Sequence, residues 1–101
     1  MVAYGEFGRP RPTVVVQANE VGQTSTTVLV CPITSGVIEN LPIRPIVEAN
    51  AENGLRVRSQ VMTDKMFAVP RNRVRSVVGL LGPEIQSRLD SALLLVLGLA
   101  R

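Results

Sequence analysis

The chain has 101 residues, of which 46% are hydrophobic and only 3% aromatic, so it can bury one modest aliphatic core. Its formal net charge is +3, and Lys65 is the single lysine among eleven basic residues, an excess of arginine that favours planar recognition of phosphate. The absence of histidine and the single cysteine, Cys31, exclude the commonest general base, an internal disulfide and a cysteine-based metal cluster. We therefore expect one domain, over residues 1–101, with no metal and no other cofactor.

The N-terminal part predicts a short strand over residues 1–7 and a glycine-containing loop that leads into Arg9-Pro10-Arg11-Pro12. Two prolines fix φ and withhold two backbone donors, so this segment is expected to be a stiff cationic loop rather than a strand. The β-branched run over residues 13–17 then predicts a buried strand. A guanidinium held in a fixed direction suits a phosphate or carboxylate, although a solvated loop is the simpler interpretation of so short a motif.

A polar turn over residues 19–23 precedes a second predicted strand over residues 24–34, in which Pro32 stands near the end. A proline at that place indicates an edge position or a bulge, which re-aims the residues that follow. Those residues are Thr34 and Ser35. Their hydroxyl groups are candidates for contacts to a substrate, and turn formation by local hydrogen bonds is the alternative.

The middle of the chain predicts a loop over residues 36–41, an uneven strand over 42–49 and a tight hairpin at Asn53-Gly54. A strand over residues 55–63 should follow. Its alternation directs three apolar side chains to the core and three polar side chains to the other face. The apolar set is Leu55, Val57 and Val61, and the polar set is Arg56, Arg58 and Gln60.

Short strands are expected over residues 66–69 and 73–81, followed by an amphipathic helix that starts at Pro83 and ends at Gly98. Three leucines widen the apolar stripe of this helix beyond what one sheet requires, which predicts partial burial by a second subunit. They are Leu94, Leu95 and Leu97. The fold class is therefore mainly β with a C-terminal helix, as a small curved barrel or coiled antiparallel sheet of six or seven strands.

The longest apolar run covers residues 92–97 and continues past Gly98, well short of the roughly 20 residues that span a bilayer. A cationic leader followed by an apolar stretch is not present at the start of the sequence. We therefore expect a cytoplasmic protein that does not contact membranes.

Five segments in this order resemble the PemK/MazF toxins of bacterial toxin–antitoxin systems, which share a fold group with the CcdB toxins. The segments cover residues 8–17, 30–35, 51–56, 59–65 and 69–71. The resemblance extends from about Val2 to the C-terminus. It departs from the family at its beginning, where these toxins carry a Gly-Asp turn and most of the first strand, so we expect a shortened first strand.

The resemblance implies a sequence-selective endoribonuclease that cuts single-stranded RNA without metal and acts as a homodimer. It also implies neutralisation by a cognate antitoxin with an acidic, disordered tail, and contact with DNA only through that antitoxin. The catalytic arginine of the family falls on Arg11 and its catalytic hydroxyl residue on Thr34. We assign Ser35 and Gln60 to supporting contacts. Basic side chains that would bind RNA or the antitoxin are Arg9, Arg56 and Arg58.

This activity agrees with the chemistry of the residues, because the 2′-hydroxyl of RNA can serve as the nucleophile and the protein must only orient the phosphate and stabilise charge. Arginine stays protonated, so the general base is left open. Two alternatives remain at this point. One is a CcdB-like poison of DNA gyrase, whose activity resides in a Trp-containing C-terminus, whereas this chain has no Trp. The other is an inactive homologue that only binds the antitoxin.

Overall fold

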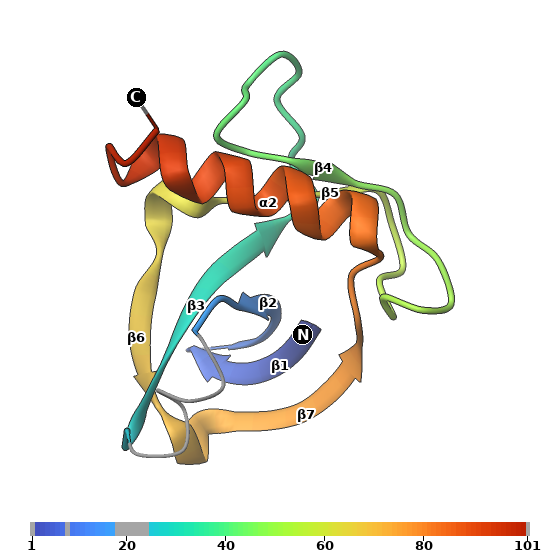
Figure 1. Ribbon diagram of the computed structural model, residues 1–101. Coiled ribbons are helices and arrows are strands. Elements are labelled where there is room, and N and C mark those ends of the chain that lie inside the picture. Colours follow the sequence, from blue (N-terminus) through green and yellow to red (C-terminus); the bar gives the residue numbers. More distant parts are fainter. Residues whose placement is uncertain (1, 8, 18–24, 101) are drawn as a thin grey trace.

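The computed structural model describes residues 2–7, 9–17 and 25–100 of the chain. Its elements form a curled antiparallel sheet crossed by one helix (Figure 1). The strands are β1 (Val2–Phe7), β2 (Arg9–Val15), β3 (Thr27–Thr34), β4 (Ile46–Val47), β5 (Ser59–Val61), β6 (Phe67–Pro70) and β7 (Val74–Gly79). The helical elements are the short η1 (Thr63–Lys65) and η2 (Arg71–Arg73) and the long α2 (Pro83–Val96). The predicted fold class, a coiled antiparallel sheet with a C-terminal helix, is confirmed.

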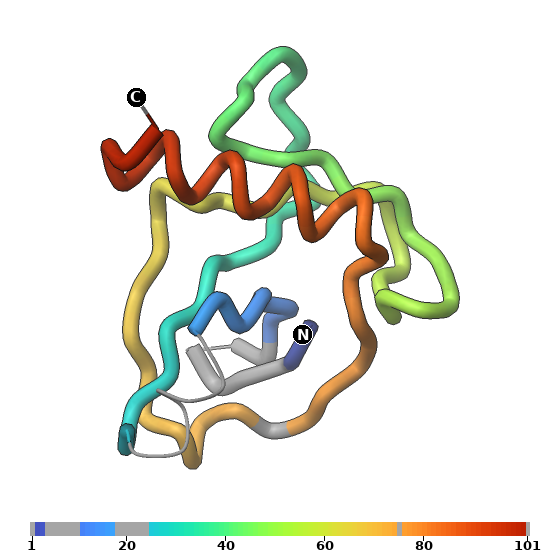
Figure 2. The backbone as a smooth tube through the Cα atoms, viewed as in Figure 1, coloured from blue at the N-terminus to red at the C-terminus, as the bar shows by residue number. Residues whose placement is uncertain are grey.

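The sheet runs in the order β4-β5-β3-β2-β1-β7, and β6 pairs with β3 beside this path. The backbone trace shows α2 running from the end of β7 across to the side where β6 lies (Figure 2), and in the sheet β1 and β2 lie between β3 and β7. The helix closes the open side of the curl, where Leu89 and Ala92 are each only 1% exposed. The main core contains Val2, Val14, Cys31, Ile33, Val47, Leu55, Val61 and Leu89.

The Arg9–Pro12 segment is part of β2 and not a loop, which corrects the expectation from its two prolines. β1 pairs with β2 along its whole length, from Val2 opposite Val14 to Phe7 opposite Arg9. On its other side, the described pairing of β2 with β3 begins only at Thr13. Prolines are tolerated where a strand has a partner on one side, because their missing donors are not needed there.

Strand β3 is shared by three partners and changes partner near Pro32. Residues 27–30 pair with β6, and residues 33–34 pair with β5. Pro32 lies between these two ladders, and its carbonyl accepts a hydrogen bond from the Met62 amide at 2.9 Å. The predicted start of β3 at Thr24 and the predicted turn at 19–23 lie outside the described residues.

Two predicted strands are much shorter than expected, because prolines and polar turns interrupt them. The strand expected over residues 42–49 is β4, only two residues long, and the one expected over 55–63 is β5, three residues long. A turn closed by the Arg44 amide on the Leu41 carbonyl, at 2.9 Å, precedes β4.

The predicted tight hairpin at Asn53-Gly54 is a longer connection that begins after β4 and ends before β5. Asn50 and Asn53 each accept the other's backbone N–H with a side-chain oxygen, at 2.8 and 3.1 Å. Gly54 has φ +69, and a Cβ there would lie 2.3 Å from the Val78 carbonyl oxygen. Glycine is therefore required at this position both for its conformation and for the close approach of β7.

Helix α2 begins and ends as predicted. Pro83 occupies its first turn together with Glu84, and Gly98 adopts φ +74 just beyond its end. The Leu99 amide donates to the Leu94 carbonyl at 2.8 Å and the Gly98 amide to the Leu95 carbonyl at 3.1 Å. This pair of bonds is a Schellman motif, which satisfies carbonyls that the helix end leaves without partners.

The C-terminal part of α2 and the residues after it expose several apolar side chains. Leu94, Leu95, Leu97 and Leu99 are between 47% and 59% exposed. In the described part of the chain, α2 and the other helical segments are too short or too polar to cross a bilayer.

Candidate active site

The register between β2 and β3 brings the two strongest sequence candidates together. Thr13 pairs with Pro32, Val14 with Cys31 and Val15 with Val30. In an antiparallel ladder each step back along one strand is one step forward along the other. The described ladder ends at the Thr13–Pro32 pair, and Arg11 and Thr34 each lie two residues beyond it, at the same end of the two strands.

Thr34 presents a hydroxyl whose orientation is set by the backbone that follows it. The residue is half-buried at the end of β3. Its Oγ1 accepts a hydrogen bond from the Gly36 amide at 3.0 Å. A hydroxyl has one hydrogen to donate and two lone pairs to accept, so this bond leaves the Thr34 hydrogen available to another oxygen.

Arg11 is exposed on β2, with Pro12 half-buried beside it. No ion pair joins Arg11 to another side chain that the structure describes. The guanidinium therefore keeps its donors for an incoming anion. Two residues further, Thr13 is buried and its hydroxyl donates to the Ala3 carbonyl at 3.2 Å, which fixes the strand behind Arg11.

Ser35 follows Thr34 at the surface. It is exposed, and its carbonyl accepts the Val37 amide at 3.1 Å. The side chain of Arg9 lies outside what the structure describes. The predicted binding role of Arg9 consequently stays a prediction.

Gln60 is not on an exposed face, which corrects the alternation predicted for residues 55–63. Its side chain is 0% exposed, whereas Val57, expected in the core, is 55% exposed. Its amide Nε2 donates to the Ile38 and Arg44 carbonyls at 2.8 and 2.7 Å, and its Oε1 accepts the Ile38 amide at 2.9 Å. Ser59, Gln60 and Val61 are all buried, because Val61 packs in the main core and the loop that contains Ile38 and Arg44 covers Gln60.

Arg58 binds carboxylates of its own chain. Its Nε donates to Glu48 at 2.7 Å and its Nη1 to Glu39 at 2.9 Å. The hydrogen bonds to Glu48 and Glu39 raise the pKa of the Arg58 guanidinium. Arg58 is thus available to RNA or to an antitoxin only by exchange of these partners, whereas Arg56 is exposed without an ion pair to any side chain that the structure describes.

An ion pair between Arg44 and Asp64, which the sequence does not predict, joins the end of the loop between β3 and β4 to η1. Arg44 Nε and Nη2 donate to Asp64 Oδ1 and Oδ2 at 2.8 and 2.9 Å, in the two-bond geometry that arginine favours. The hydrogen bond from Arg44 lowers the pKa of Asp64. Two residues 20 positions apart form this pair, so no local pattern indicates it.

Cys31 lies in β3 three residues before Thr34, but it is 0% exposed. Burial, with a smaller contribution from the charge of Asp64, raises the pKa of the Cys31 thiol to about 11. The thiolate, which is the reactive form, is therefore disfavoured at neutral pH. Cys31 is a core residue, as expected from its context.

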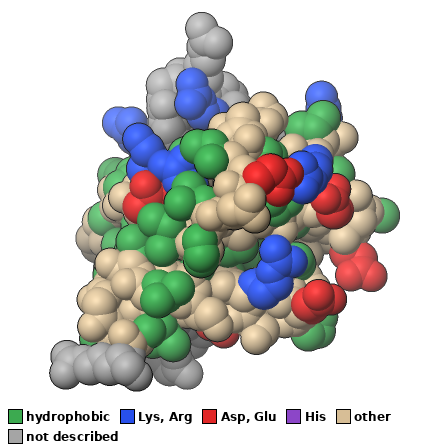
Figure 3. Space-filling model, turned by 90° about the horizontal axis from the view of Figure 1, so that it is seen from above, with side chains coloured by type: hydrophobic (Ala, Val, Ile, Leu, Met, Phe, Trp, Pro, Cys, Tyr) green, Lys and Arg blue, Asp and Glu red, His purple; other side chains and the backbone are tan. Residues whose placement is uncertain are grey.

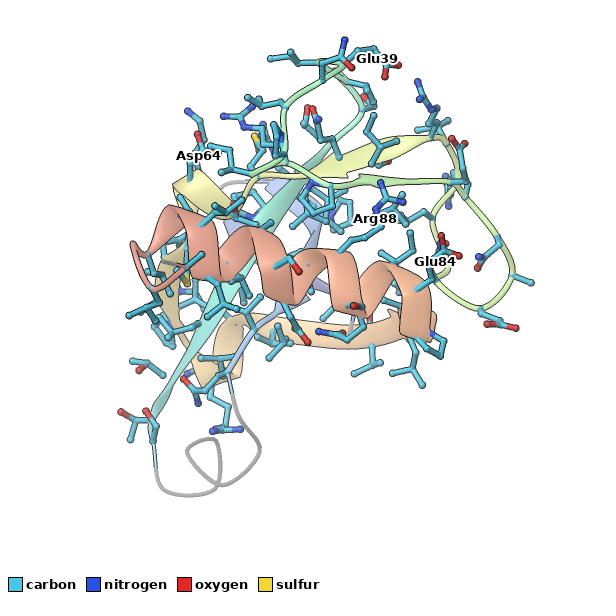
Figure 4. The ribbon with its side chains drawn as sticks, turned by 45° about the horizontal axis from the view of Figure 1, so that its top comes forward. Glu39, Asp64, Glu84 and Arg88 are labelled. Atoms are coloured by element: carbon cyan, nitrogen blue, oxygen red, sulfur yellow. The ribbon has the colours of Figure 1, made fainter. Side chains whose placement is uncertain are left out.

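The face of the molecule seen from above mixes charges of both signs with apolar side chains (Figure 3). Beneath the loop that precedes β4, Arg88 extends from α2 toward the β4 segment, while Glu39 lies at the far end of that loop (Figure 4). A groove of about 550 Å³ separates these elements. Its lining includes Arg44, Arg88, Ile46, Ala92 and Leu95.

Groups of three or more His, Cys, Asp or Glu side chains placed to hold a metal ion do not occur among the described residues. The fold and the geometry define a small curled-sheet protein with an exposed arginine, Arg11, and an oriented hydroxyl, Thr34, at the same end of two paired strands. Such a pair is suited to binding a phosphate group.

Comparison with known proteins assigns the family. Residues 2–97 match the model of the PemK-like, MazF-like toxin of type II toxin-antitoxin system. The chain is 34% identical over 93 residues to the "Probable endoribonuclease MazF" of Mycolicibacterium smegmatis, with 92% of this chain and 84% of that protein covered. The chain belongs to the PemK/MazF toxin family.

Solved structures agree with this assignment. The Mycobacterium tuberculosis toxin MazF-mt6 superposes with a TM-score of 0.87 at 25% identity, covering 99% of this chain and 98% of that one. A mycobacterial endoribonuclease in complex with its cognate antitoxin has the same fold, with a TM-score of 0.84 at 17% identity and coverage of 99% and 93%. MazE-MazF from Deinococcus radiodurans (Form-II) gives a TM-score of 0.79 at 19% identity and coverage of 98% and 92%.

Proposed function

We propose that this chain is an endoribonuclease toxin that cuts single-stranded RNA, and so inhibits translation and growth. Family membership and the relative named as a probable endoribonuclease support the activity. The observation that supports Arg11 and Thr34 as the site is the β2–β3 ladder, because both residues lie two positions beyond its last pair, at the same end of the two strands. These comparisons favour the ribonuclease over the gyrase poison. Residues 1–101 would then act as one toxin domain.

In the proposed reaction the RNA supplies its own nucleophile. The 2′-oxygen attacks the adjacent phosphorus and the bond from phosphorus to the 5′-oxygen breaks, which leaves a 2′,3′-cyclic phosphate and a 5′-hydroxyl. The 2′-hydroxyl loses one proton to water or to the substrate, and the leaving 5′-oxygen gains one. The protein is required only to orient the phosphate and to stabilise its charge.

Arg11 and Thr34 would divide this work. The exposed guanidinium of Arg11 would donate to the non-bridging oxygens, where negative charge builds up in the transition state. Thr34, whose Oγ1 already accepts from Gly36, would donate its hydrogen to a phosphoryl oxygen. Ser35, exposed beside it, would add a supporting contact. Arg9 and Arg56 would bind the RNA backbone, and Arg58 would bind carboxylates of the antitoxin after exchange of Glu39 and Glu48.

A cognate antitoxin with an acidic, disordered tail would neutralise the toxin in the cytoplasm, and DNA would be contacted only through that antitoxin. The family is defined by type II toxin-antitoxin systems, and fold relatives have been solved with an antitoxin. Adding the antitoxin should protect RNA from cleavage. A stoichiometric complex that still cuts RNA would count against this part of the proposal.

A homodimer would cover the apolar C-terminal surface. Leu94, Leu95, Leu97 and Leu99 are between 47% and 59% exposed, which is unusual for one side of a monomeric helix. Sedimentation equilibrium should give twice the chain mass, and Leu94→Glu with Leu97→Glu should shift it toward one chain mass. An unaltered mass in the double variant would place the dimer contact elsewhere.

The activity is tested directly with purified protein and a panel of single-stranded RNAs in EDTA. We expect cuts at a short sequence motif, with 2′,3′-cyclic phosphate and 5′-hydroxyl ends. A panel left intact, both in EDTA and with added Mg²⁺, would overturn the proposed activity. Cleavage that appears only with Mg²⁺ would overturn the metal-independent mechanism alone.

A further inference from the structure

All three hydrogen bonds of the Gln60 side chain are made with the backbone of the loop between β3 and β4. The side chain is 0% exposed, and its three hydrogen bonds of 2.7–2.9 Å all end on main-chain atoms of Ile38 and Arg44. Both amide hydrogens are used, so Gln60 has none left for a substrate. Ile38 lies near the start and Arg44 near the end of this loop, which connects Thr34 of β3 to Ile46 of β4 and projects beyond α2 (Figure 1).

Gln60 also fixes the segment that begins with Thr34. Its backbone pairs with Thr34 in the β3–β5 ladder, and its side-chain amide bonds both the N–H and the C=O of Ile38. The Gln60 side-chain amide thus pairs with the Ile38 backbone as the backbone of a neighbouring strand residue would. Between these two anchors lie the Gly36 amide that orients the Thr34 hydroxyl and the turn from the Ser35 carbonyl to Val37.

We propose that Gln60 is a positioning residue for RNA cleavage: by holding Ile38 and Arg44 it keeps Gly36 in the place that orients the Thr34 hydroxyl toward the phosphate. The inference rests on the proposed function and names a residue that acts through Thr34 without touching RNA. Arg11 and Arg56 are not on this loop, so their contacts with RNA do not depend on Gln60. Loss of the amide should therefore act on kcat and leave KM nearly unchanged.

The test compares Gln60→Glu and Gln60→Asn with Ser59→Ala. In Gln60→Glu the side chain keeps its shape, but the NH₂ group that donates to the Ile38 and Arg44 carbonyls is replaced by an oxygen that can only accept. In Gln60→Asn the amide is kept, but the side chain is one methylene too short to reach the loop. Ser59 is an adjacent buried polar residue whose hydroxyl bonds the Val57 carbonyl, away from the loop. Misplacement of a reacting group by about 1 Å costs roughly 100-fold, so we expect kcat to fall about 10- to 100-fold in both Gln60 variants. Ser59→Ala should stay within about threefold of the wild type in kcat, within the spread usual for a site away from the chemistry.

The pH profile separates positioning from a general loss of stability. A buried glutamate that faces two carbonyl oxygens has a raised pKa, so it gains a proton as the pH falls and can then donate one hydrogen bond again. The kcat of Gln60→Glu relative to wild type should therefore rise between about pH 8 and pH 5.5, while the ratio for Gln60→Asn stays flat. Because protonation of a buried glutamate also stabilises the fold, the folded fraction is measured by circular dichroism at each pH and kcat is expressed per folded molecule; a rise that vanishes after this correction overturns the positioning role.

Amide hydrogen exchange of Ile38 provides a readout that is independent of activity. We expect faster exchange at Ile38 in Gln60→Asn, whose shorter side chain falls short of the Ile38 amide, and wild-type exchange in Ser59→Ala; Gln60→Glu keeps an oxygen acceptor for this amide and is judged by kcat and the pH profile. Wild-type kcat in a folded Gln60 variant with fast Ile38 exchange overturns the positioning role, as does a change confined to KM. If Gln60→Glu does not fold, Gln60→Asn alone decides the same question by kcat and exchange. If the wild-type protein cuts no RNA, the proposed function itself is contradicted. The wild-type assay alone decides that question, independently of the Gln60 variants.

Discussion

Two polar regions of this protein each combine an arginine with an uncharged polar side chain, but they differ in whether the hydrogen-bond donors of those side chains are already used. In the first, Arg11 is exposed without an ion pair to any described side chain, and Thr34 keeps a hydrogen to donate. In the second, Arg58 is bound by two carboxylates, and both amide hydrogens of Gln60 are used by the backbone. The difference indicates where chemistry is possible, because only groups with unused donors can meet a substrate.

The contrast also separates two kinds of stabilisation. Gln60 is 0% exposed, so water does not compete for its side-chain amide, which makes three bonds to the backbone of Ile38 and Arg44. The ion pairs of Arg58 are exposed, with 46% of its side chain and 61–72% of its partners accessible. Exposed pairs contribute little and exchange readily with other anions. The first arrangement fixes the loop, and the second can be released.

The largest effect is expected from Arg11→Ala. Removing a preorganised donor to a transition-state oxyanion costs roughly 100- to 1,000-fold in kcat, and we expect a loss of that size in single-turnover cleavage. Arg73→Ala, an exposed arginine at the end of η2, is the matched control and should cut at the wild-type rate. Equal losses in both variants would show that bulk positive charge, not Arg11, supports cleavage.

Thr34→Val should have the next largest effect. It keeps the shape of the side chain but removes the hydroxyl that accepts from Gly36 and that would donate to phosphate. We expect a kcat loss of roughly 10- to 100-fold, and partial recovery in Thr34→Ser, measured with one defined RNA. Valine and serine variants of equal activity would exclude a role for the hydroxyl.

Cys31 tests whether a nucleophile in the same strand as Thr34 takes part. The folded pKa of about 11 lies above the ordinary value of 9.0, so folding favours the neutral thiol. The stabilisation is complete below about pH 9 and is lost as the pH rises through 11. We expect full activity in Cys31→Ala at a cost in stability, and no reaction of native Cys31 with a thiol reagent at pH 8. Rapid labelling at that pH would contradict its burial.

The smallest effects should distinguish Arg56 from Arg58. A phosphate contact contributes about one to the slope of log affinity against log salt, so Arg56→Ala should lower that slope by about one. Arg58→Ala should leave the slope unchanged and lower the melting temperature slightly in dilute buffer, but not in about 1 M salt. Reversal of these two results would mean that RNA displaces Glu39 and Glu48.

Much of the fold follows from local sequence. The start and end of α2 could be predicted from Pro83 and Gly98, and the glycine at position 54 was correctly expected to adopt positive φ. The Arg9–Pro12 segment was assigned wrongly, because the pairing of β1 with β2 outweighs the cost of two prolines on a side without a described partner. Tertiary pairing of this kind is not encoded in a short motif.

The candidate site was predictable only in part. The catalytic roles of Arg11 and Thr34 were assigned through the family resemblance, and no local pattern gives the β2–β3 pairing that puts both residues at the same end of their strands. The burial of Gln60 was missed because alternation describes a strand with one open face, whereas the loop between β3 and β4 covers that face of β5. The Arg44–Asp64 pair joins residues distant in sequence and left no signal.

A double-mutant cycle on Arg11 and Thr34 tests the central claim most directly. Single-turnover cleavage would be measured for wild type, Arg11→Ala, Thr34→Val and the double variant on one defined RNA in EDTA. Groups that act on the same phosphate as a unit are strongly non-additive, so the double variant should cut about as slowly as Arg11→Ala alone. Losses that multiply fully would show that the two residues act independently, and a double variant as fast as wild type would place the active site elsewhere.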